Sequence, residues 1–133
     1  MTVFVDTSAF LAVLNREDRY HEQAARQWRR FIDEEERLLC NNYVVVETTA
    51  LLQRRFGLEA VRALEGNVLR AMVVIWLDET AHQQAVTALL SANRRQLSLV
   101  DCSAMTTMRL LGLKRIFTFD AHFDDYGFNK VPG

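Results

Sequence analysis

Three aspartates of this sequence stand where a short apolar run ends or where a helix begins. Asp6 follows the apolar run at residues 3–5, and Asp120 follows the run at residues 116–119. Asp101 falls in the first turn of a helix that is predicted to start near residue 98. In a parallel sheet, the carboxyl ends of the strands and the amino ends of the following helices lie along one edge. We therefore expect these three carboxylates to lie close together.

A fourth acid, Glu47, lies within an apolar stretch. If residues 42–56 form a helix, Glu47 shares a face with Tyr43, Val44 and Leu51. Burying a carboxylate costs free energy unless it has a partner, and clustered carboxylates raise one another's pKa unless a cation lies among them. Oxygen ligands without a His or Cys ligand set favour a hard divalent ion, Mg²⁺ or Mn²⁺. Such ions promote the hydrolysis of phosphodiesters.

Each aspartate also has a structural explanation when it is taken alone. Asp6 is a suitable N-cap for the helix that follows it, and Asp120 can begin a turn or cap a short helix. Ser98 and Asp101 have the spacing of a capping box. These explanations do not account for why all of these acids should fall at one edge of the same sheet.

The net charge is −1, from 16 basic and 17 acidic residues, so the protein as a whole has little electrostatic attraction for nucleic acid. Fourteen of the basic residues are Arg, the side chain that binds phosphate and carboxylate in a fork. Arg54 and Arg55 follow Glu47 by about two helical turns. They can pair with that carboxylate or bind an anion at the surface.

Length and composition predict one globular domain over residues 1–133, with 50% apolar and 25% charged residues. One Pro and five Gly are too few for a turn-rich all-β fold. Cys40 and Cys102 cannot form a disulfide framework or a four-thiolate zinc site, so we expect buried free thiols in a reducing compartment. No apolar run is long enough to cross a membrane, and the first residues do not resemble a secretory signal. We expect a cytoplasmic protein.

Short apolar runs alternate with helical patterns along the chain. The predicted strands cover residues 3–5, 38–40, 73–77, 115–119 and 126–131. The predicted helices cover residues 7–14, 20–34, 42–56, 58–72, 80–93 and 98–112. Asn41 or Asn42 can cap the third helix and Gly57 can end it, although residues 44–46 could instead prolong a strand. Thr80 and Gln83 have the spacing of a capping box. This alternation predicts an α/β fold with a mainly parallel sheet.

Other chemistries fit less well. The sequence has no glycine-rich dinucleotide motif, no Walker loop and no paired-histidine zinc motif, and its three histidines are scattered. Asp6-Thr7-Ser8 lacks the second acid that haloacid dehalogenase-type phosphatases carry, and a response-regulator receiver would have an acidic pair early in the chain.

Four segments resemble motifs of the PIN domain, and within it the toxin ribonucleases of VapBC-type toxin–antitoxin pairs. The first is VFVDTSA at residues 3–9, and the second is Glu47 on its predicted helix. The third is SLVDCSA at residues 98–104, and the last is FTFDAHF at residues 117–123, followed by YGF at 126–128. Together these segments extend over nearly the whole chain.

The resemblance implies a PIN-like three-layer sandwich, in which helices flank a central, mainly parallel sheet. It places Asp6, Glu47, Asp101 and Asp120 around Mg²⁺ or Mn²⁺. Asp124 is a candidate fifth acid, with Asp125 as the competing choice. Thr7 and Thr118 would hydrogen-bond the ligands, although both can equally be ordinary strand-end and cap hydroxyls. The resemblance gives His122 no assured role, and we expect it to be a loop residue.

The activity that follows from the resemblance is metal-dependent hydrolysis of an RNA phosphodiester. Asp6, Asp101 and Asp120 would hold the cation, and Glu47 would bind a second ion or orient the attacking water. Surface arginines such as Arg54 and Arg55 would position the RNA backbone. The resemblance also implies a homodimer and a small antitoxin that covers the acidic site. Two alternatives stay open: a stand-alone PIN-like nuclease that processes RNA or acts on DNA flaps, and a non-enzymatic module that binds RNA or protein.

Overall fold

The computed structural model describes all 133 residues, and five parallel strands form its centre. The strands are β1 (Thr2–Val5), β2 (Arg37–Asn41), β3 (Met72–Ile75), β4 (Arg115–Phe117) and β5 (Asn129–Val131). Their order in the sheet is β3-β2-β1-β4-β5, and each neighbouring pair is parallel. The prediction of an α/β fold with a parallel central sheet is confirmed.

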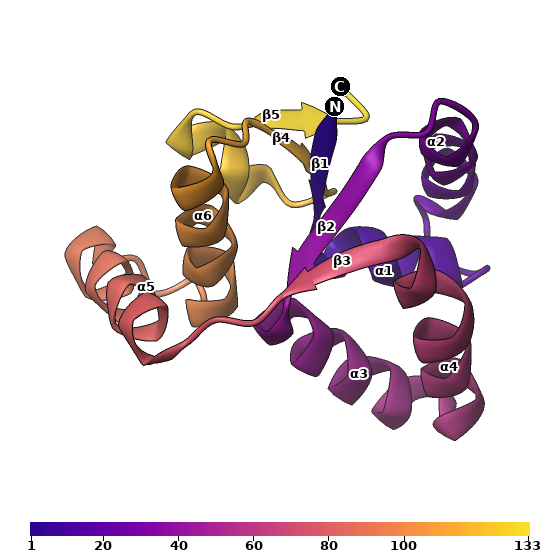
Figure 1. Ribbon diagram of the computed structural model, residues 1–133. Helices are drawn as coiled ribbons and strands as arrows, with labels where there is room; N and C mark the ends of the chain where they lie inside the picture. Colours follow the sequence, from indigo (N-terminus) through magenta and orange to yellow (C-terminus); the bar gives the residue numbers. More distant parts are fainter.

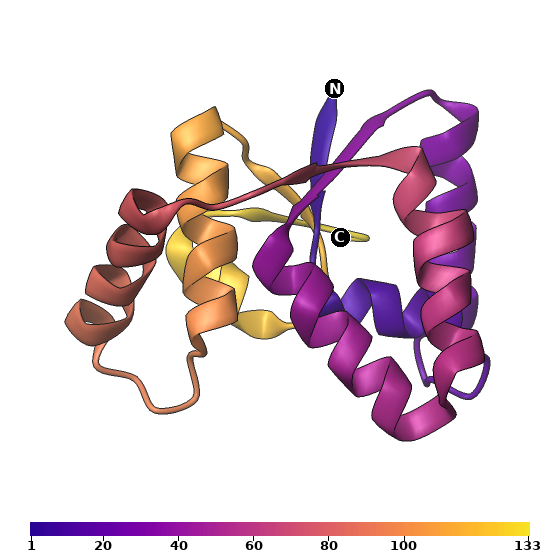
Figure 2. The ribbon, with the colours of Figure 1, turned by 60° about the horizontal axis from the view of Figure 1, so that its bottom comes forward.

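Helices connect the strands and cover both faces of the sheet (Figure 1). The helices are α1 (Thr7–Leu14), α2 (His21–Asp33), α3 (Asn42–Phe56), α4 (Leu58–Ala63), α5 (Glu79–Ala92) and α6 (Leu99–Leu111). The first four join β1 to β2 and β2 to β3 on one side, whereas α5 and α6 return across the other side to β4. From β1 the chain adds strands on one side of the sheet, β2 and then β3, and it then returns to add β4 and β5 on the other side of β1. The order of the strands therefore reverses between β1 and β4. Parallel sheets bind ligands at the carboxyl ends of the strands at such a point, and Figure 2 brings this edge forward.

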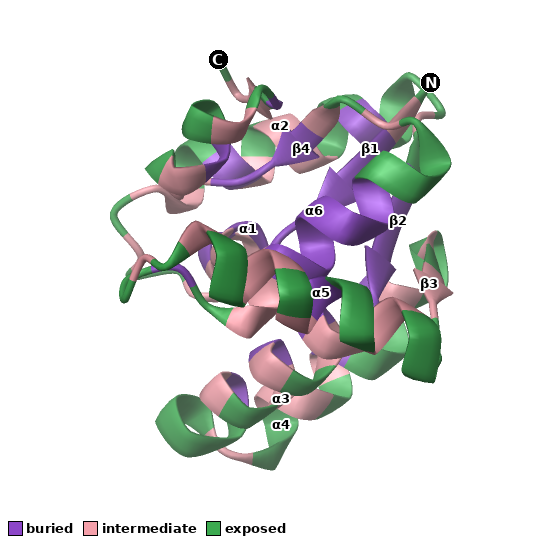
Figure 3. Ribbon diagram, turned by 90° about the vertical axis from the view of Figure 1, so that its left-hand side faces the viewer, coloured by how far each residue is buried: buried purple, intermediate pink, exposed green.

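Burial explains why β1 is central. Val3, Phe4 and Val5 have no exposed surface and belong to a hydrophobic core of 25 buried residues. A strand that is covered on both faces has apolar residues at successive positions rather than at alternate ones. Helix α6 is buried along most of its length, between α5 and the sheet (Figure 3). The outer side of α5 is exposed in the same view.

Helix α3 begins and ends where its sequence predicted. Asn41 is the N-cap, and its Oδ1 accepts a hydrogen bond from the Val44 N–H at 2.9 Å. Gly57 ends the helix with φ at 81°, a conformation that a residue with a Cβ rarely adopts. The alternative of a strand at residues 44–46 is wrong, because the Asn41 cap starts the helix before them.

The predicted helix at residues 58–72 is interrupted. Helix α4 ends at Ala63, and the chain continues as a π-helical turn (Leu64–Val68) and a 3-10 turn (Leu69–Ala71). Gly66 and Asn67 lie within the wide turn and have low helix propensity. Leu64 and Val68, at the two ends of this turn, are both buried.

The predicted capping box at Thr80 and Gln83 is wrong. Helix α5 begins earlier, with Asp78 as its N-cap, and Asp78 Oδ1 accepts a hydrogen bond from the Ala81 N–H at 2.9 Å. Aspartate is at least as good an N-cap as threonine, so the earlier residue takes the role.

Both cysteines are free and buried, as predicted. None of the helices combines the length and the apolar character needed to span a bilayer.

A partly buried ion pair joins the start of β4 to the turn before β2. Arg115 Nη1 lies 3.1 Å from Glu36 Oε1, and the Met1 ammonium lies 3.3 Å from Glu36 Oε2. Burial raises the pKa of Glu36, but the hydrogen bond and charge of Arg115 and the Met1 ammonium outweigh it, so the pKa is lower than usual. The ionised carboxylate therefore stabilises this contact between strands.

Candidate metal centre

Asp6 is buried at the end of β1, with 3% of its surface exposed. Its backbone N–H donates to the carbonyl of Phe117 on β4 at 3.0 Å. Its Oδ2 accepts hydrogen bonds from Thr118 Oγ1 at 2.8 Å and Ser8 Oγ at 2.9 Å. Although Asp6 occupies the N-cap position of α1, its side chain makes no capping hydrogen bond. The capping explanation therefore does not apply to Asp6.

The environment of Asp6 disfavours its charge. Burial raises the pKa of Asp6 to about 6, and the nearby charge of Asp101 also raises it. The hydrogen bonds from Thr118 and Ser8 act in the opposite direction but do not offset the burial. A buried carboxylate in this condition is stabilised by any cation that reaches it.

Ser8 and Thr118 tie the ends of β1 and β4 together. Their hydroxyl oxygens lie 3.0 Å apart, and the Phe119 N–H donates to Ser8 Oγ at 3.0 Å. The Asp120 N–H donates to Thr118 Oγ1, also at 3.0 Å. The hydroxyl of Thr118 thus orients Asp6 and holds the backbone of Asp120.

Asp101 has the capping role that its sequence allowed. Ser98 Oγ accepts from the Asp101 N–H at 2.9 Å, and Asp101 Oδ2 accepts from the Ser98 N–H at 3.1 Å. Burial nevertheless raises the pKa of Asp101, and the charge of Asp120 adds to this effect against the hydrogen bonds from Ser98. Asp101 therefore has both roles at once. The capping box holds its side chain in place, and the same carboxylate lies close to that of Asp120.

Asp101, Asp120 and His122 bring their ligand atoms within 4.8 Å of one another. Asp120 caps a 3-10 turn (Ala121–Tyr126), and its Oδ1 accepts from the His122 N–H at 2.9 Å. His122 Nε2 lies 3.8 Å from the same oxygen. Sequence reasoning treated His122 as a loop residue. The two-residue spacing in Asp-x-His after a strand was the signal that it missed.

Glu47 lies outside this group of ligand atoms. No ion pair joins it to Arg54 or Arg55, and both arginines are exposed in the last turn of α3. The turn of α3 that carries Glu47 packs against the start of α1 through a 3.5 Å contact between Thr48 Oγ1 and Thr7 Oγ1. The turn of α3 that carries Glu47 therefore lies next to α1, the helix that follows Asp6.

The structure differs from the expectation for Thr7. Its hydroxyl meets Thr48 rather than a carboxylate, and Ser8 takes the place beside Asp6 instead. The helical start after Asp6 turns these two neighbouring side chains in different directions.

Asp124 and Asp125 each face a basic side chain. Asp124 Oδ2 lies 3.3 Å from Lys130 Nζ, and Asp125 Oδ2 lies 3.3 Å from Arg94 Nη1. Both aspartates are exposed, and neither belongs to the group formed by Asp101 and its neighbours.

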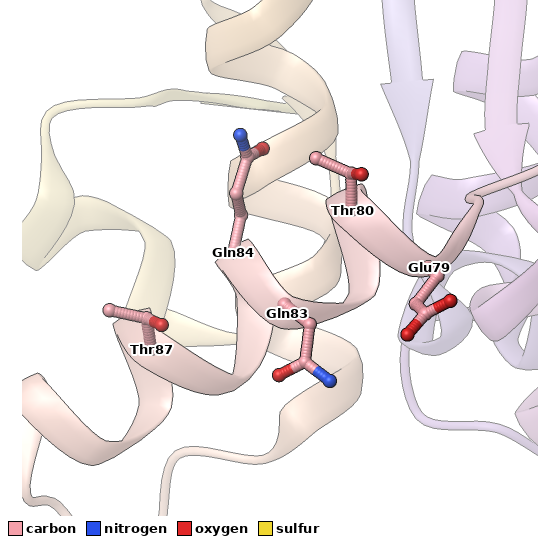
Figure 4. Close-up of a pocket in the computed structure, with 5 residues that line it drawn as sticks. All are labelled: Glu79, Thr80, Gln83, Gln84 and Thr87. Carbon is pink, nitrogen blue, oxygen red and sulfur yellow. The ribbon is translucent and has the colours of Figure 1, made fainter.

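A separate hollow of about 480 Å³ lies on the outer face of α5 (Figure 4). Its lining consists of Glu79, Thr80, Gln83, Gln84 and Thr87, all from one helix. It holds a single carboxylate, so it does not offer the charge that a divalent ion requires.

Comparison with known proteins supplies independent findings. The model of the PIN domain family matches residues 3–129. Two proteins named 23S rRNA-specific endonuclease VapC20, from the CDC 1551 / Oshkosh and the ATCC 25618 / H37Rv strains of Mycobacterium tuberculosis, are each 31% identical to this chain over 132 residues. In both cases the match covers 97% of this chain and 97% of the relative.

Two solved structures resemble this chain over nearly its whole length. The crystal structure of Mycobacterium tuberculosis VapC20, described as a Sarcin-Ricin loop cleaving toxin, superimposes with a TM-score of 0.85 at 31% identity. The match covers 96% of each chain. The crystal structure of FitAcB from Neisseria gonorrhoeae gives a TM-score of 0.68 at 16% identity over 97% of each chain, which is a likeness of fold.

Proposed function

The chain belongs to the PIN domain family, and from this membership we propose that it is an endoribonuclease toxin that hydrolyses RNA with the help of a divalent metal ion. The observation that carries the proposal is the meeting of Asp101, Asp120 and His122 at the sheet edge where buried Asp6 ends β1. The match to VapC20 over nearly the full length of both chains supports the nuclease activity and the toxin role.

The donor set fits Mg²⁺ or Mn²⁺. Carboxylate oxygens are the ligands that these ions prefer, and Asp6 and Asp101 both have a raised pKa that a cation would lower. We propose that Asp6, Asp101 and Asp120 hold the ion. When bound, such an ion polarises a phosphoryl oxygen and makes a water more acidic.

The residues around the carboxylates hold them in fixed orientations. Ser8 and Thr118 fix Asp6 Oδ2, and the capping box fixes Asp101, so the carboxylates are held before the substrate arrives. Groups that need no rearrangement stabilise a transition state more than mobile ones do. We assign Glu47 the role of orienting the attacking water or of binding a second ion, because its turn of α3 packs against α1, the helix that follows Asp6.

We propose ribosomal RNA as the substrate class, since both VapC20 relatives are named for 23S rRNA. Arg54 and Arg55, exposed at the end of α3, would contact the phosphate backbone. Binding through phosphates weakens as salt rises. The action on RNA and the two free thiols both fit the cytoplasm.

We further propose two protein partners, a small antitoxin and a second copy of the chain. Support comes from apolar side chains that are exposed beyond the edge strand β3 and at the end of α6: Trp76, Leu110 and Leu111. Exposed apolar groups gathered on one side are typical of a protein interface.

The decisive experiment incubates the purified protein, freed of any antitoxin, with RNA and Mg²⁺ or Mn²⁺. We expect new RNA ends that disappear with EDTA or with Asp120→Asn. Asp78→Asn is the matched control, because asparagine also caps a helix and Asp78 lies at the start of α5. Cleavage that continues at full rate in EDTA would contradict the metal mechanism. Harmless expression of an active enzyme in cells would contradict the toxin role.

A further inference from the structure

We propose that a pocket beside the carboxylates, between the α1–α2 loop and the residues that follow β4, binds one unpaired nucleobase of the RNA. This proposal rests on the proposed function, because the base belongs to the strand being cleaved. The pocket has a volume of about 450 Å³, and the residues that carry the argument are Ser8, Asp18, Arg19, Tyr20, Phe119 and Asp120. We call it the base pocket.

The base pocket shares two residues with the candidate metal centre. Asp120 lines it and also belongs to the acidic group, and Ser8 lines it while its hydroxyl donates to Asp6. A phosphodiester held at the carboxylates therefore has a neighbouring nucleotide at the mouth of this pocket. The volume lies within the range of about 300–1,000 Å³ that small-ligand pockets occupy.

Two aromatic rings form a stack on the pocket wall. The ring centroids of Tyr20 and Phe119 lie 4.7 Å apart, and the rings are nearly parallel at 9°. The phenylalanine pairs of the molecule meet at 64° to 73° instead, as close-packed core rings commonly do. A parallel, partly exposed stack is the arrangement on which proteins place single-stranded bases.

Arg19 lies on the outside of this stack. Its Cζ lies 4.8 Å from the centroid of the Tyr20 ring, and its side chain is exposed. Bases stack on guanidinium planes as well as on aromatic rings. An exposed arginine can move outward at little cost, so the base enters between the guanidinium of Arg19 and the ring of Tyr20.

The loop that carries these groups is already ordered by its own hydrogen bonds. Asp18 Oδ1 accepts from the Tyr20 N–H at 2.8 Å, and the Asp18 N–H donates to the Asn15 carbonyl at 3.0 Å. The other oxygen of Asp18 has no hydrogen-bond or ionic partner, although Asp18 lines the pocket. It is an acceptor for an amino group on a base edge. The base pocket therefore offers one acceptor to a donor on the edge of a base.

The test uses short single-stranded oligoribonucleotides that carry 2-aminopurine at successive positions, mixed with the protein in Ca²⁺. Stacking on an aromatic ring quenches the fluorescence of 2-aminopurine, so this readout does not depend on cleavage. We expect quenching at one position with the wild type and with Tyr20→Phe. Tyr20→Leu should lose the quenching and bind that oligonucleotide about tenfold more weakly. Tyr126→Leu is the control, because Tyr126 also has an arginine, Arg94, over its ring but lies outside the base pocket.

A second variant and a cleavage assay complete the test. Arg19→Gln changes an exposed side chain, so we expect a folded protein that binds the quenched oligonucleotide several-fold more weakly. In cleavage, an abasic residue at the quenched position should lower kcat/KM about tenfold for the wild type and hardly at all for Tyr20→Leu.

Failure of the base pocket and failure of the nuclease proposal are distinguishable. Quenching that requires Tyr20, in a protein that cuts no RNA, would leave the base pocket standing and remove the nuclease function. Cleavage by a wild type that quenches at no position, or that quenches equally in Tyr20→Leu, would overturn the base pocket and leave the nuclease function intact.

Discussion

Replacing Asp6 by asparagine should make the metal-free protein gain stability, relative to the wild type, as the pH rises from 4 to 8. Burial raises the pKa of Asp6 from 3.8 to about 6, so the folded protein holds this proton more tightly than the unfolded chain does. Stability linked to Asp6 is therefore fully present below about pH 4 and is lost as the pH rises through 6. Asparagine has no charge to lose, so its variant escapes this loss.

The magnitude follows from the two pKa values. A difference of about two pH units corresponds to about 3 kcal/mol of unfolding free energy at pH 8. The amide also changes the hydrogen bonds with Ser8 and Thr118, at a cost that does not depend on pH. The useful quantity is therefore the stability difference between variant and wild type at pH 8 minus the same difference at pH 4. It should be about 2.5 kcal/mol in favour of the variant, because the unfolded chain is already partly ionised at pH 4, and this is on the order of 10 °C in Tm for a domain of this size.

Urea unfolding followed by circular dichroism, in EDTA at a series of pH values from 4 to 8, measures this quantity. Asp78→Asn is the control, since Asp78 is an exposed N-cap and asparagine preserves the cap. Its stability difference from the wild type should hardly change with pH.

One result would refute the reasoning. If Asp6→Asn differs from the wild type by the same amount at pH 4 and pH 8, then Asp6 is ionised without cost in the folded protein. The buried charge of Asp6 would then not be unfavourable in the metal-free protein. The proposal of a metal centre would lose its electrostatic support.

Other outcomes follow from the same contacts. Saturating Mg²⁺, at about a hundred times its Kd, should raise the unfolding free energy of the wild type by about 3 kcal/mol. Thermal melts should show that Asp101→Asn shrinks this increment, whereas Ser98→Ala lowers metal-free stability by about 1 kcal/mol and keeps the increment. Thr118→Val removes a donor to the buried carboxylate, so urea unfolding should show a loss of about 1–2 kcal/mol at pH 8 and a smaller one at pH 4. Arg115→Gln should have the opposite pH dependence. Because the pKa of Glu36 is lowered, its stabilisation is present above pH 4.5 and lost in acid, so urea curves should show a loss of about 1–3 kcal/mol at pH 7 that fades near pH 3.

Local patterns were enough to place the strands and most helices. The apolar runs that end at Asp6 and before Asp120 are typical of strands that are buried on both faces, and the parallel sheet then brings their ends together. Gly57 and Asn41 marked the limits of α3 through their own conformational preferences.

What the sequence did not reveal depends on contacts between distant residues. The side chains of Ser8 and Asp6 meet Thr118, which lies more than a hundred residues away and which no local pattern links to them. The place of His122 beside Asp120 depends on a 3-10 turn that packs near the start of α6. The interruption after α4 falls where Gly66 and Asn67 weaken the helix and where packing buries Leu64 and Val68, and the burial could not be read from the local pattern.

The hydrogen bond between Asp6 and Thr118 spans 112 residues, and the pairing of β1 with β4 spans a similar distance. During synthesis, the amino-terminal part of a chain emerges first, and pairings between distant segments form last. Strand β1 therefore emerges long before the strand that completes its environment. The nascent polypeptide carries Asp6 without the Thr118 contact that orients it until β4 has left the ribosome. A nuclease assembled in this order would become active only as its translation ends.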